Sequence, residues 1–93
     1  MWYVYILRCG DGTLYTGSTD DVERRLAAHR AGKGAKYTRG RGPLELVYSE
    51  PCGEHAAALR REYVEAMKAS LRAQLDNTVI IDEYGHHKYL KKS

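Results

Sequence analysis

The stretch that decides the fold is residues 2–18, which read WYVYILRCGDGTLYTGS. Residues 2–8 and 14–18 are rich in β-branched and aromatic side chains, and the Gly-Asp-Gly between them at 10–12 is a turn signal. Apolar side chains stand at both odd and even positions of the first segment, which is typical of a central strand covered on two faces. The stretch therefore predicts a β-hairpin at the centre of a sheet.

The length of the turn decides which side chains share a face of that hairpin. A two-residue turn at residues 11–12 would place Tyr5 and Tyr15 on opposite faces. A three-residue turn at residues 10–12, with its last glycine left-handed, pairs Tyr5 with Gly17 instead. We favour this second register, in which both tyrosines share a face and Gly17 leaves space above Tyr5. The alternative role for both side chains is that of core aromatics with satisfied hydroxyls.

The remaining chain predicts a mixed α/β domain. The elements expected in order are a helix from Asp20, with Glu23 completing a capping box, to about Ala31; a glycine-rich loop over 33–43; a strand over 44–49; a helix over 54–68; a short helix over 70–75; and a short strand over 78–81. The order β-β-α-β-α predicts a small antiparallel three-stranded sheet flanked by helices. We expect one domain over residues 1–93, with a core of about 2–76, a loose tail from Gly85 and no assigned role for 77–93.

Composition limits the class of protein. The chain has 93 residues, of which 43% are hydrophobic and 29% charged, an ordinary balance for one folded domain. A core this thin favours a shallow, open site over a deep cavity. The first apolar run is interrupted by Arg8, too early for a membrane span, and it lacks the pattern of a signal peptide. We therefore expect a soluble, cytoplasmic protein whose two cysteines are reduced.

Positive charge is concentrated in one segment. Residues 23–42 carry seven Lys or Arg against a single acid, with glycines and an aromatic residue between them. This pattern favours a polyanionic partner, since cations contact phosphates, glycines admit a close backbone approach and an aromatic ring can stack on a base. The alternative is a solvated, solubilising loop. The candidate nucleic-acid contacts are Gly17, Arg24, Lys33, Lys36, Tyr37, Arg39 and Arg41.

The first helix carries candidate reactive groups. Val22, Arg25, Leu26 and His29 fall on one helical stripe. The two apolar residues can anchor the stripe on the sheet, which leaves Arg25 and His29 at its boundary. An arginine there can hold a phosphate, and a histidine can exchange a proton near neutral pH. The alternatives are an arginine that snorkels to solvent and a partly buried structural histidine.

The second helix adds an acid to this set. Its expected apolar stripe comprises Ala56, Leu59, Tyr63 and Ala66 or Met67, and Glu62 borders that stripe. A carboxylate in this position coordinates a hard cation such as Mg²⁺ or Mn²⁺, or it pairs with an arginine. A single carboxylate would leave most of a metal shell to water and phosphate oxygens.

Together these residues resemble those of the GIY-YIG nuclease domain family. The sequence YVY at residues 3–5, followed by YTG at residues 15–17, is similar to the two motifs that name the family. Arg25, His29 and Glu62 stand where the remaining active-site residues of the family are expected. The similarity to small stand-alone bacterial members covers about residues 2–68.

The resemblance implies a DNA endonuclease that uses one divalent metal, Mg²⁺ or Mn²⁺. By this resemblance Tyr5 activates the attacking water, His29 draws the tyrosine proton, Tyr15 contacts phosphate, Arg25 stabilises the pentavalent phosphorus and Glu62 holds the metal. The implied substrate is DNA, including branched or single-stranded forms, in repair or recombination. Two alternatives stay open: a nucleic-acid-binding module that does not cleave, and an accessory nuclease domain that depends on a protein partner for DNA specificity.

Overall fold

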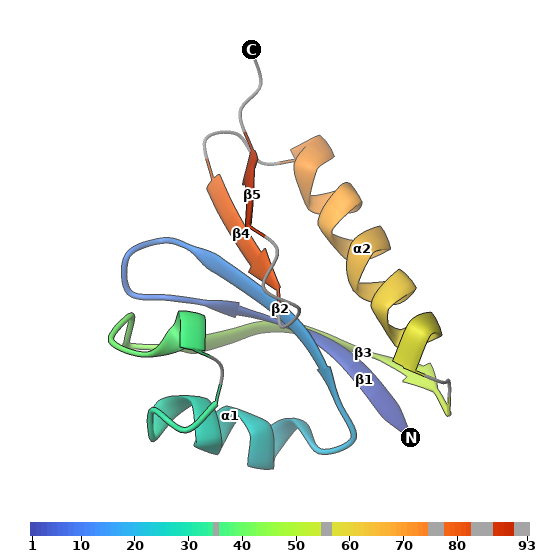
Figure 1. Ribbon diagram of the computed structural model, residues 1–93, viewed down its shortest axis with the longest axis horizontal. Coiled ribbons are helices and arrows are strands. Elements are labelled where there is room, and N and C mark those ends of the chain that lie inside the picture. The colour runs from blue at the N-terminus through green and yellow to red at the C-terminus, as the bar shows by residue number, and fades with distance from the viewer. Residues whose placement is uncertain (35, 55–56, 75–77, 83–86, 91–93) are drawn as a thin grey trace.

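The chain has a mixed α/β fold, in which α1 covers one face of a single β-sheet and α2 covers the other (Figure 1). The computed structural model describes residues 1–34, 36–54, 57–74, 78–82 and 87–90. Its elements are β1 (Trp2–Arg8), β2 (Leu14–Thr19), α1 (Val22–Arg30), the 3₁₀ helix η1 (Lys36–Thr38), β3 (Glu45–Gly53), α2 (Ala57–Gln74), β4 (Thr78–Asp82) and β5 (His87–Leu90). The strands form one sheet in the order β3-β1-β2-β4-β5.

The central hairpin has the predicted register. Tyr5 lies opposite Gly17, and the pairing of β1 with β2 is antiparallel throughout. Gly12 adopts a φ of 85°, the left-handed conformation that a three-residue turn needs in its last position. The Cys9 amide donates to the Thr13 carbonyl at 2.8 Å and closes the turn. The turn length is therefore what places both site tyrosines on one face of the sheet.

The sheet is larger than the sequence predicts. The three strands expected in the sheet are present, and the short strand expected over 78–81 is confirmed as β4, which adds to β2 in parallel. Strand β5 adds to β4 antiparallel, so the described sheet has five strands. The expectation of a loose tail from Gly85 is wrong for residues 87–90, which form β5. Leu14 pairs with Ile80, far away in sequence, and no local pattern of either segment encodes such a parallel pairing.

The helices differ from the prediction at their ends. The N-cap of α1 is Asp21 rather than Asp20, because Asp21 takes the extended conformation and its carboxylate accepts from the Arg24 amide at 3.1 Å. The second helix is continuous over α2 rather than divided near residue 69. None of the helices in the described segments is long and apolar enough to cross a membrane.

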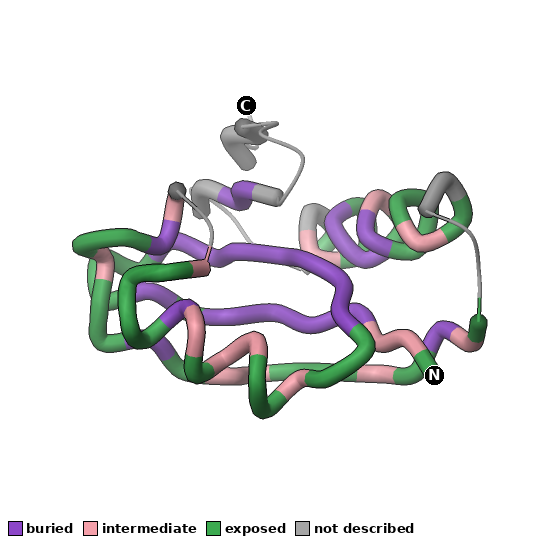
Figure 2. The backbone as a smooth tube through the Cα atoms, turned by 60° about the horizontal axis from the view of Figure 1, so that its bottom comes forward, coloured by how far each residue is buried: buried purple, intermediate pink, exposed green. Residues whose placement is uncertain are grey.

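Each face of the sheet has its own hydrophobic cluster, and burial is greatest along the two central strands (Figure 2). Beneath α2 lie Val4, Ile6, Leu14, Cys52, Val64, Met67 and Ile80. On the α1 face lie Tyr5, Leu7, Cys9, Tyr15, Leu44 and Ile81, with Leu26 of α1 packed against them. The two described cysteines are free and buried. Alternation along β1 thus separates the tyrosine face from the face that α2 covers.

Candidate active site

Two buried tyrosines form the centre of the site. Tyr5 of β1 is 2% exposed and Tyr15 of β2 is 1% exposed, and their ring centroids lie 6.3 Å apart. Both point to the α1 face, as the register requires. The two rings are therefore enclosed rather than exposed to solvent.

Gly17 provides the space that the Tyr5 ring occupies. A Cβ atom added at Gly17 would lie 2.7 Å from the Tyr5 hydroxyl oxygen and 2.9 Å from the ring carbon that carries it. Such distances are shorter than van der Waals contact. The sequence suggested Gly17 as a nucleic-acid contact, but the structure buries it behind Tyr5 and gives it a packing role.

We expect Gly17→Ala to displace the Tyr5 side chain and to destabilise the fold. Overpacking of this kind costs about 1–3 kcal/mol, which lowers the melting temperature of a domain this small by roughly 5–20 °C. Thermal unfolding followed by circular dichroism measures the change. Gly42→Ala is the matched control, since an added Cβ there meets no atom within 4 Å. Equal melting temperatures for the two variants would contradict the close packing of Tyr5 on Gly17.

Helix α1 brings His29 to Tyr5. The Tyr5 hydroxyl and His29 Nε2 lie 2.9 Å apart, in a hydrogen bond between two buried side chains. The other ring nitrogen, Nδ1, lies 2.9 Å from Oγ1 of Thr38 in η1. The Tyr15 ring packs edge-on against the imidazole at 5.1 Å between centroids. His29 therefore has a hydrogen-bonding partner at each ring nitrogen.

The buried His29 ring is held neutral. Burial, and secondly the charge of Arg25, lower the pKa of His29 from 6.5 to about 4. A neutral imidazole carries one N–H and one lone pair, so it can accept a proton from one of its partners. The sequence placed His29 only at the boundary of the helix stripe, whereas the structure buries it to 2% exposure.

We expect the free energy of unfolding to fall as the pH is lowered from 6.5 to about 4. The unfolded chain takes up a proton at His29 near pH 6.5, whereas the folded chain takes it up only near pH 4. The stabilisation is complete above pH 6.5 and is lost through this interval, by about 3 kcal/mol from His29 alone. Urea unfolding at a series of pH values measures it. In His29→Gln this part of the pH dependence should be absent, and equal pH dependence in both proteins would contradict a buried neutral His29.

Arg25 links the two tyrosines. Burial by itself lowers the pKa of its guanidinium, but hydrogen bonding and charge interactions with Tyr5 and Tyr15 outweigh burial, and the pKa of Arg25 is raised. The Arg25 side chain is half-buried. The structure thus brings together four predicted site residues, Tyr5, Tyr15, Arg25 and His29.

The predicted nucleic-acid contacts divide into exposed and structural residues. Arg24, Lys33 and Arg39 are exposed, and the Lys36 side chain lies outside the described part of the structure. Tyr37 is half-buried, because it packs against the hydrophobic cluster on the α1 face that contains Tyr5 and Tyr15.

Arg41 has a structural contact that the sequence does not reveal. Its Nη1 lies 3.0 Å from Oδ2 of Asp11 and 3.3 Å from the Thr13 hydroxyl, both in the hairpin turn. The Gly10 amide donates to the Arg41 carbonyl at 2.5 Å. Arg41 therefore fastens the glycine-rich loop over residues 33–43, called the basic loop from here on, to the β1–β2 turn.

Glu62 is not brought to the tyrosines. The predicted apolar stripe of α2 is wrong at Leu59 and Tyr63, which are 43% and 40% exposed, and confirmed at Met67, which is buried together with Val64. The predicted stripe residue Ala56 lies outside the described residues. Glu62 is two residues from Val64, about 200° around the helix, and its side chain is exposed. The buried side of α2 differs from the predicted one because the helix continues without interruption to Leu71. Leu71 lies in the same row as Val64 and Met67 and packs against the same hydrophobic cluster.

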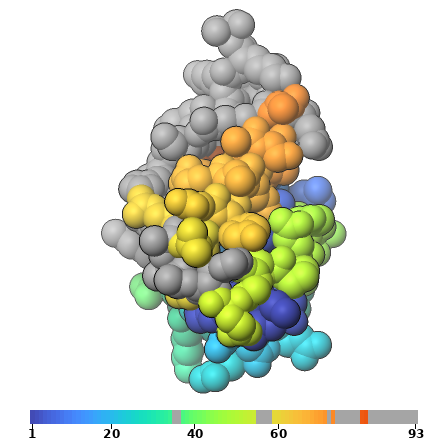
Figure 3. All heavy atoms as spheres, turned by 90° about the vertical axis from the view of Figure 1, so that its right-hand side faces the viewer, coloured from blue at the N-terminus to red at the C-terminus, as the bar shows by residue number. Residues whose placement is uncertain are grey.

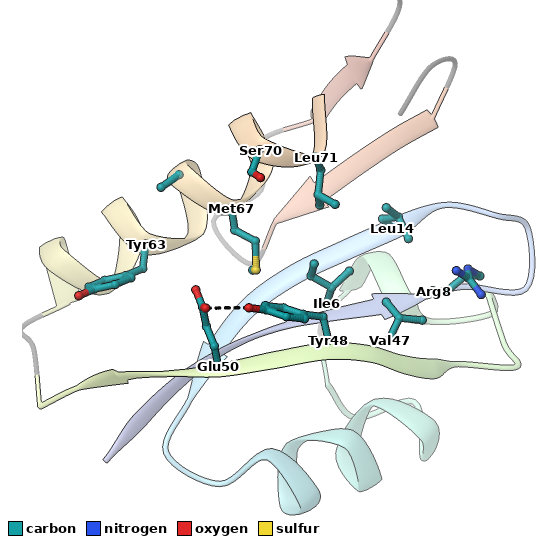
Figure 4. Close-up of a pocket in the computed structure, with 11 residues that line it drawn as sticks. Ile6, Arg8, Leu14, Val47, Tyr48, Glu50, Tyr63, Met67, Ser70 and Leu71 are labelled. Atoms are coloured by element: carbon teal, nitrogen blue, oxygen red, sulfur yellow. Dashed lines mark hydrogen bonds between the residues drawn. The ribbon is translucent and has the colours of Figure 1, made fainter. Parts of the chain in front are cut away.

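The α2 side of the sheet carries a recess. A groove of about 720 Å³ runs between α2 and strands β1 and β3, which lie next to each other in Figure 3, and Figure 4 shows the side chains that line it. Tyr48 donates a hydrogen bond to Glu50 at 2.7 Å at its rim. Glu62 does not line the groove.

The described residues do not fit a metal centre beside Tyr5. In the described segments no group of three or more His, Cys, Asp or Glu side chains could hold a metal ion. The single predicted ligand, Glu62, stands on the outer side of α2.

Thr38 is the site residue that the sequence did not indicate. It is 2% exposed and contacts His29 from the basic loop, nine residues along the chain. No helical or strand period relates the two positions. A lone threonine among cations gives no signal that could have identified it.

The sequence profile described as the GIY-YIG catalytic domain matches residues 1–69. A UPF0213 protein of Natronomonas pharaonis is 52% identical over 83 residues, which are 89% of this chain and 94% of that protein. UPF0213 protein YhbQ of Escherichia coli K12 is 55% identical over 62 residues, 67% of this chain and 62% of YhbQ. The solution NMR structure of UPF0213 protein BH0048 from Bacillus halodurans matches with 48% identity and a TM-score of 0.40, over 78% of this chain and 84% of that one.

Proposed function

The chain belongs to the GIY-YIG catalytic domain family, and on that premise we propose that it is an endonuclease that hydrolyses phosphodiester bonds of DNA. The observation that supports this most strongly is the buried hydrogen bond between the Tyr5 hydroxyl and His29 Nε2, beside the Arg25 guanidinium. A phenol, a neutral imidazole and a fixed cation are the groups needed to activate water next to a phosphate.

The reaction begins with Tyr5. Transfer of its proton to His29 Nε2 leaves a phenolate, which removes a proton from the attacking water. The water oxygen forms a bond to phosphorus, and the bond from phosphorus to the leaving sugar oxygen breaks. The leaving oxygen takes up a proton from solvent, and His29 releases the proton of Tyr5 to solvent. An ordinary phenol has a pKa of about 10, so the phenolate needs support from a neighbouring positive charge. Arg25 is in place to supply it.

Substrate binding would strengthen His29 as a base. The charge of Arg25 is one cause of the lowered pKa of His29. A phosphodiester that binds Arg25 brings a negative charge that offsets this effect, so the imidazole regains affinity for a proton as the substrate arrives.

The exposed cations Arg24, Lys33 and Arg39 are proposed to hold the DNA backbone, together with Lys36. Tyr15 is proposed to contact the scissile phosphate. Branched or single-stranded DNA and a role in repair or recombination, in the cytoplasm, are part of the same proposal.

Metal dependence rests on the family alone. A bound Mg²⁺ or Mn²⁺ would supply charge stabilisation of the pentavalent phosphorus. Glu62 is the proposed ligand, although its exposed position on α2 does not place its carboxylate beside Tyr5.

A second candidate function is that of an accessory nuclease domain, active only with a protein partner. The enclosed tyrosines and the distant Glu62 favour it over a plain binding module, because a partner could open the site. A binding module that does not cleave needs only the exposed cations and has no use for the Tyr5–His29 hydrogen bond.

A cleavage assay tests the proposal. End-labelled single-stranded, duplex, flap and branched DNA, and an RNA of the same sequence, are incubated with the protein and Mg²⁺, Mn²⁺ or EDTA. We expect cutting of at least one DNA that EDTA prevents. Binding of DNA without any cutting would overturn the proposal in favour of a binding module or a partner-dependent domain.

A further inference from the structure

We propose that a recess between the end of α1 and the basic loop, called the loop recess from here on, is a second phosphate site. In it, Arg30 and Arg39 hold one phosphate group of a nucleic-acid strand. The inference rests on the proposed function in one respect, because the strand is that of the DNA substrate. It adds Arg30, which is not among the contacts expected from the sequence, and it gives Arg39 a defined ligand.

The loop recess adjoins the tyrosine site. Its volume is about 330 Å³, and His29 lines it. The same imidazole contacts the Tyr5 hydroxyl through Nε2, so a strand whose scissile phosphate lies at Tyr5 passes close to the recess. The lining includes two arginines and three glycines, and no Asp or Glu. A cavity with cations and no acid in its wall is complementary to an anion.

Glycines keep the loop recess open. A Cβ atom added at Gly32, Gly40 or Gly42 would meet no atom within 4 Å. Gly32 and Gly40 have φ values of 74° and 70°, conformations that other residues rarely adopt. Bare backbone therefore forms part of the wall, and a phosphate can approach it closely.

Arg30 is held at the loop recess. Its Nη2 donates to the Leu44 carbonyl at 3.2 Å, and Leu44 is buried just before β3. A guanidinium has five N–H donors in a planar fork, so one bond to a carbonyl leaves donors for phosphate oxygens. An arginine in the last turn also interacts favourably with the helix dipole, but that role requires neither a recess nor a second arginine.

Arg39 supplies the second positive charge. It is exposed and lines the loop recess from the basic loop. Within the described segments neither Arg30 nor Arg39 forms an ion pair, whereas Arg41 pairs with Asp11. Two like charges at one recess repel each other, and a bound phosphate offsets that repulsion.

A double-mutant cycle tests whether the two arginines hold the same phosphate. Arg30→Gln, Arg39→Gln and the double variant are titrated with a fluorescent single-stranded DNA oligonucleotide in EDTA, and fluorescence anisotropy measures the dissociation constant. Arg8→Gln is the matched control, because Arg8 is also an exposed arginine but lies at the groove beneath α2. Thermal unfolding verifies the fold of each variant.

We expect each single variant to weaken binding about tenfold. The double variant should lose less than the product of the two single losses, because both arginines contact one phosphate. Arg30→Gln combined with Arg24→Gln should show the full product, because Arg24 does not line the loop recess. Arg8→Gln should bind like the wild type.

Amide NMR provides a second measurement that does not depend on the Arg30 variants. The Gly40 amide signal should move when the oligonucleotide is added to the wild type or to Arg8→Gln. In Arg39→Gln it should move much less at the same oligonucleotide concentration.

The oligonucleotide is used with a 5′-phosphate and with a 5′-hydroxyl to identify the source of the phosphate. Equal losses with the two forms, which we expect, assign the loop recess to an internal phosphate. Losses confined to the phosphorylated form assign it to the phosphate at a strand end.

Wild-type affinity in Arg30→Gln would overturn the proposal, as would single losses that multiply in full when Arg30→Gln and Arg39→Gln are combined. The two arginines would then be independent surface charges. A wild type that binds neither oligonucleotide would overturn it as well. A wild type that shows the expected binding but cuts no DNA with Mg²⁺ or Mn²⁺ would contradict the proposed nuclease function alone.

Discussion

Tyr5→Phe should abolish most DNA cleavage while leaving the fold intact. The substitution removes only the hydroxyl that lies 2.9 Å from His29 Nε2, and with it the group proposed to take the proton of water. Loss of a general base slows a reaction about 10²- to 10⁴-fold. Single-turnover cleavage of labelled DNA measures the rate, and circular dichroism verifies the fold.

Tyr48→Phe is the matched control for this substitution. Tyr48 lies on β3 with 46% exposure, and its hydroxyl donates to Glu50 rather than to any site residue. We expect wild-type cleavage from Tyr48→Phe and wild-type DNA affinity from both variants. A Tyr5→Phe protein that cuts at the wild-type rate would show that the Tyr5 hydroxyl does not take part in the chemistry.

Arg25→Gln should slow DNA cleavage by a similar factor, because it removes a stabilising positive charge rather than a group that transfers a proton. Removal of one group that stabilises developing negative charge costs about 10²- to 10³-fold in rate. The pKa of His29 should at the same time rise above its value of about 4, because the Arg25 charge is one of the causes of that low value. Cleavage kinetics and an NMR titration of His29 measure the two effects.

Arg24→Gln, the exposed neighbour on α1, is the control for Arg25→Gln. It should weaken DNA binding slightly, make that binding less dependent on salt and leave the His29 titration unchanged. If Arg25→Gln and Arg24→Gln behave alike, Arg25 is an ordinary surface cation and the proposed electrostatic role is wrong.

The local part of the fold could be predicted because short-range rules determine it. The three-residue turn, with its left-handed Gly12, fixes the pairing of Tyr5 with Gly17. The helical period then brings Arg25 and His29 to the same side of α1. These rules concern neighbouring residues in the sequence, which is why the tyrosine–arginine–histidine group could be anticipated from the sequence.

The long-range part could not be predicted for the same reason. The pairing of β2 with β4 joins segments that share no turn. The face that α2 buries depends on where the helix ends and on Ile80, a residue beyond that end. For this reason the sequence predicts the wrong buried side for α2 and places Glu62 at its border.

The basic loop shows a further limit. Thr38 and Arg41 acquire their roles from contacts with α1 and with the hairpin turn, and both residues look like ordinary loop polar groups in the sequence. Charge counting alone assigned Arg41 to the nucleic acid, although its guanidinium pairs with Asp11.

Cleavage in ¹⁸O-labelled water tests most directly whether the chain hydrolyses DNA. Wild-type protein and a labelled branched duplex are incubated under single-turnover conditions with Mg²⁺ or Mn²⁺, and the product phosphate is analysed by mass spectrometry. Attack by water on phosphorus predicts a cleaved strand whose new terminal phosphate carries one ¹⁸O atom. Bound but uncut DNA, or a cut strand whose phosphate carries no label, would contradict hydrolysis at the Tyr5–His29–Arg25 site.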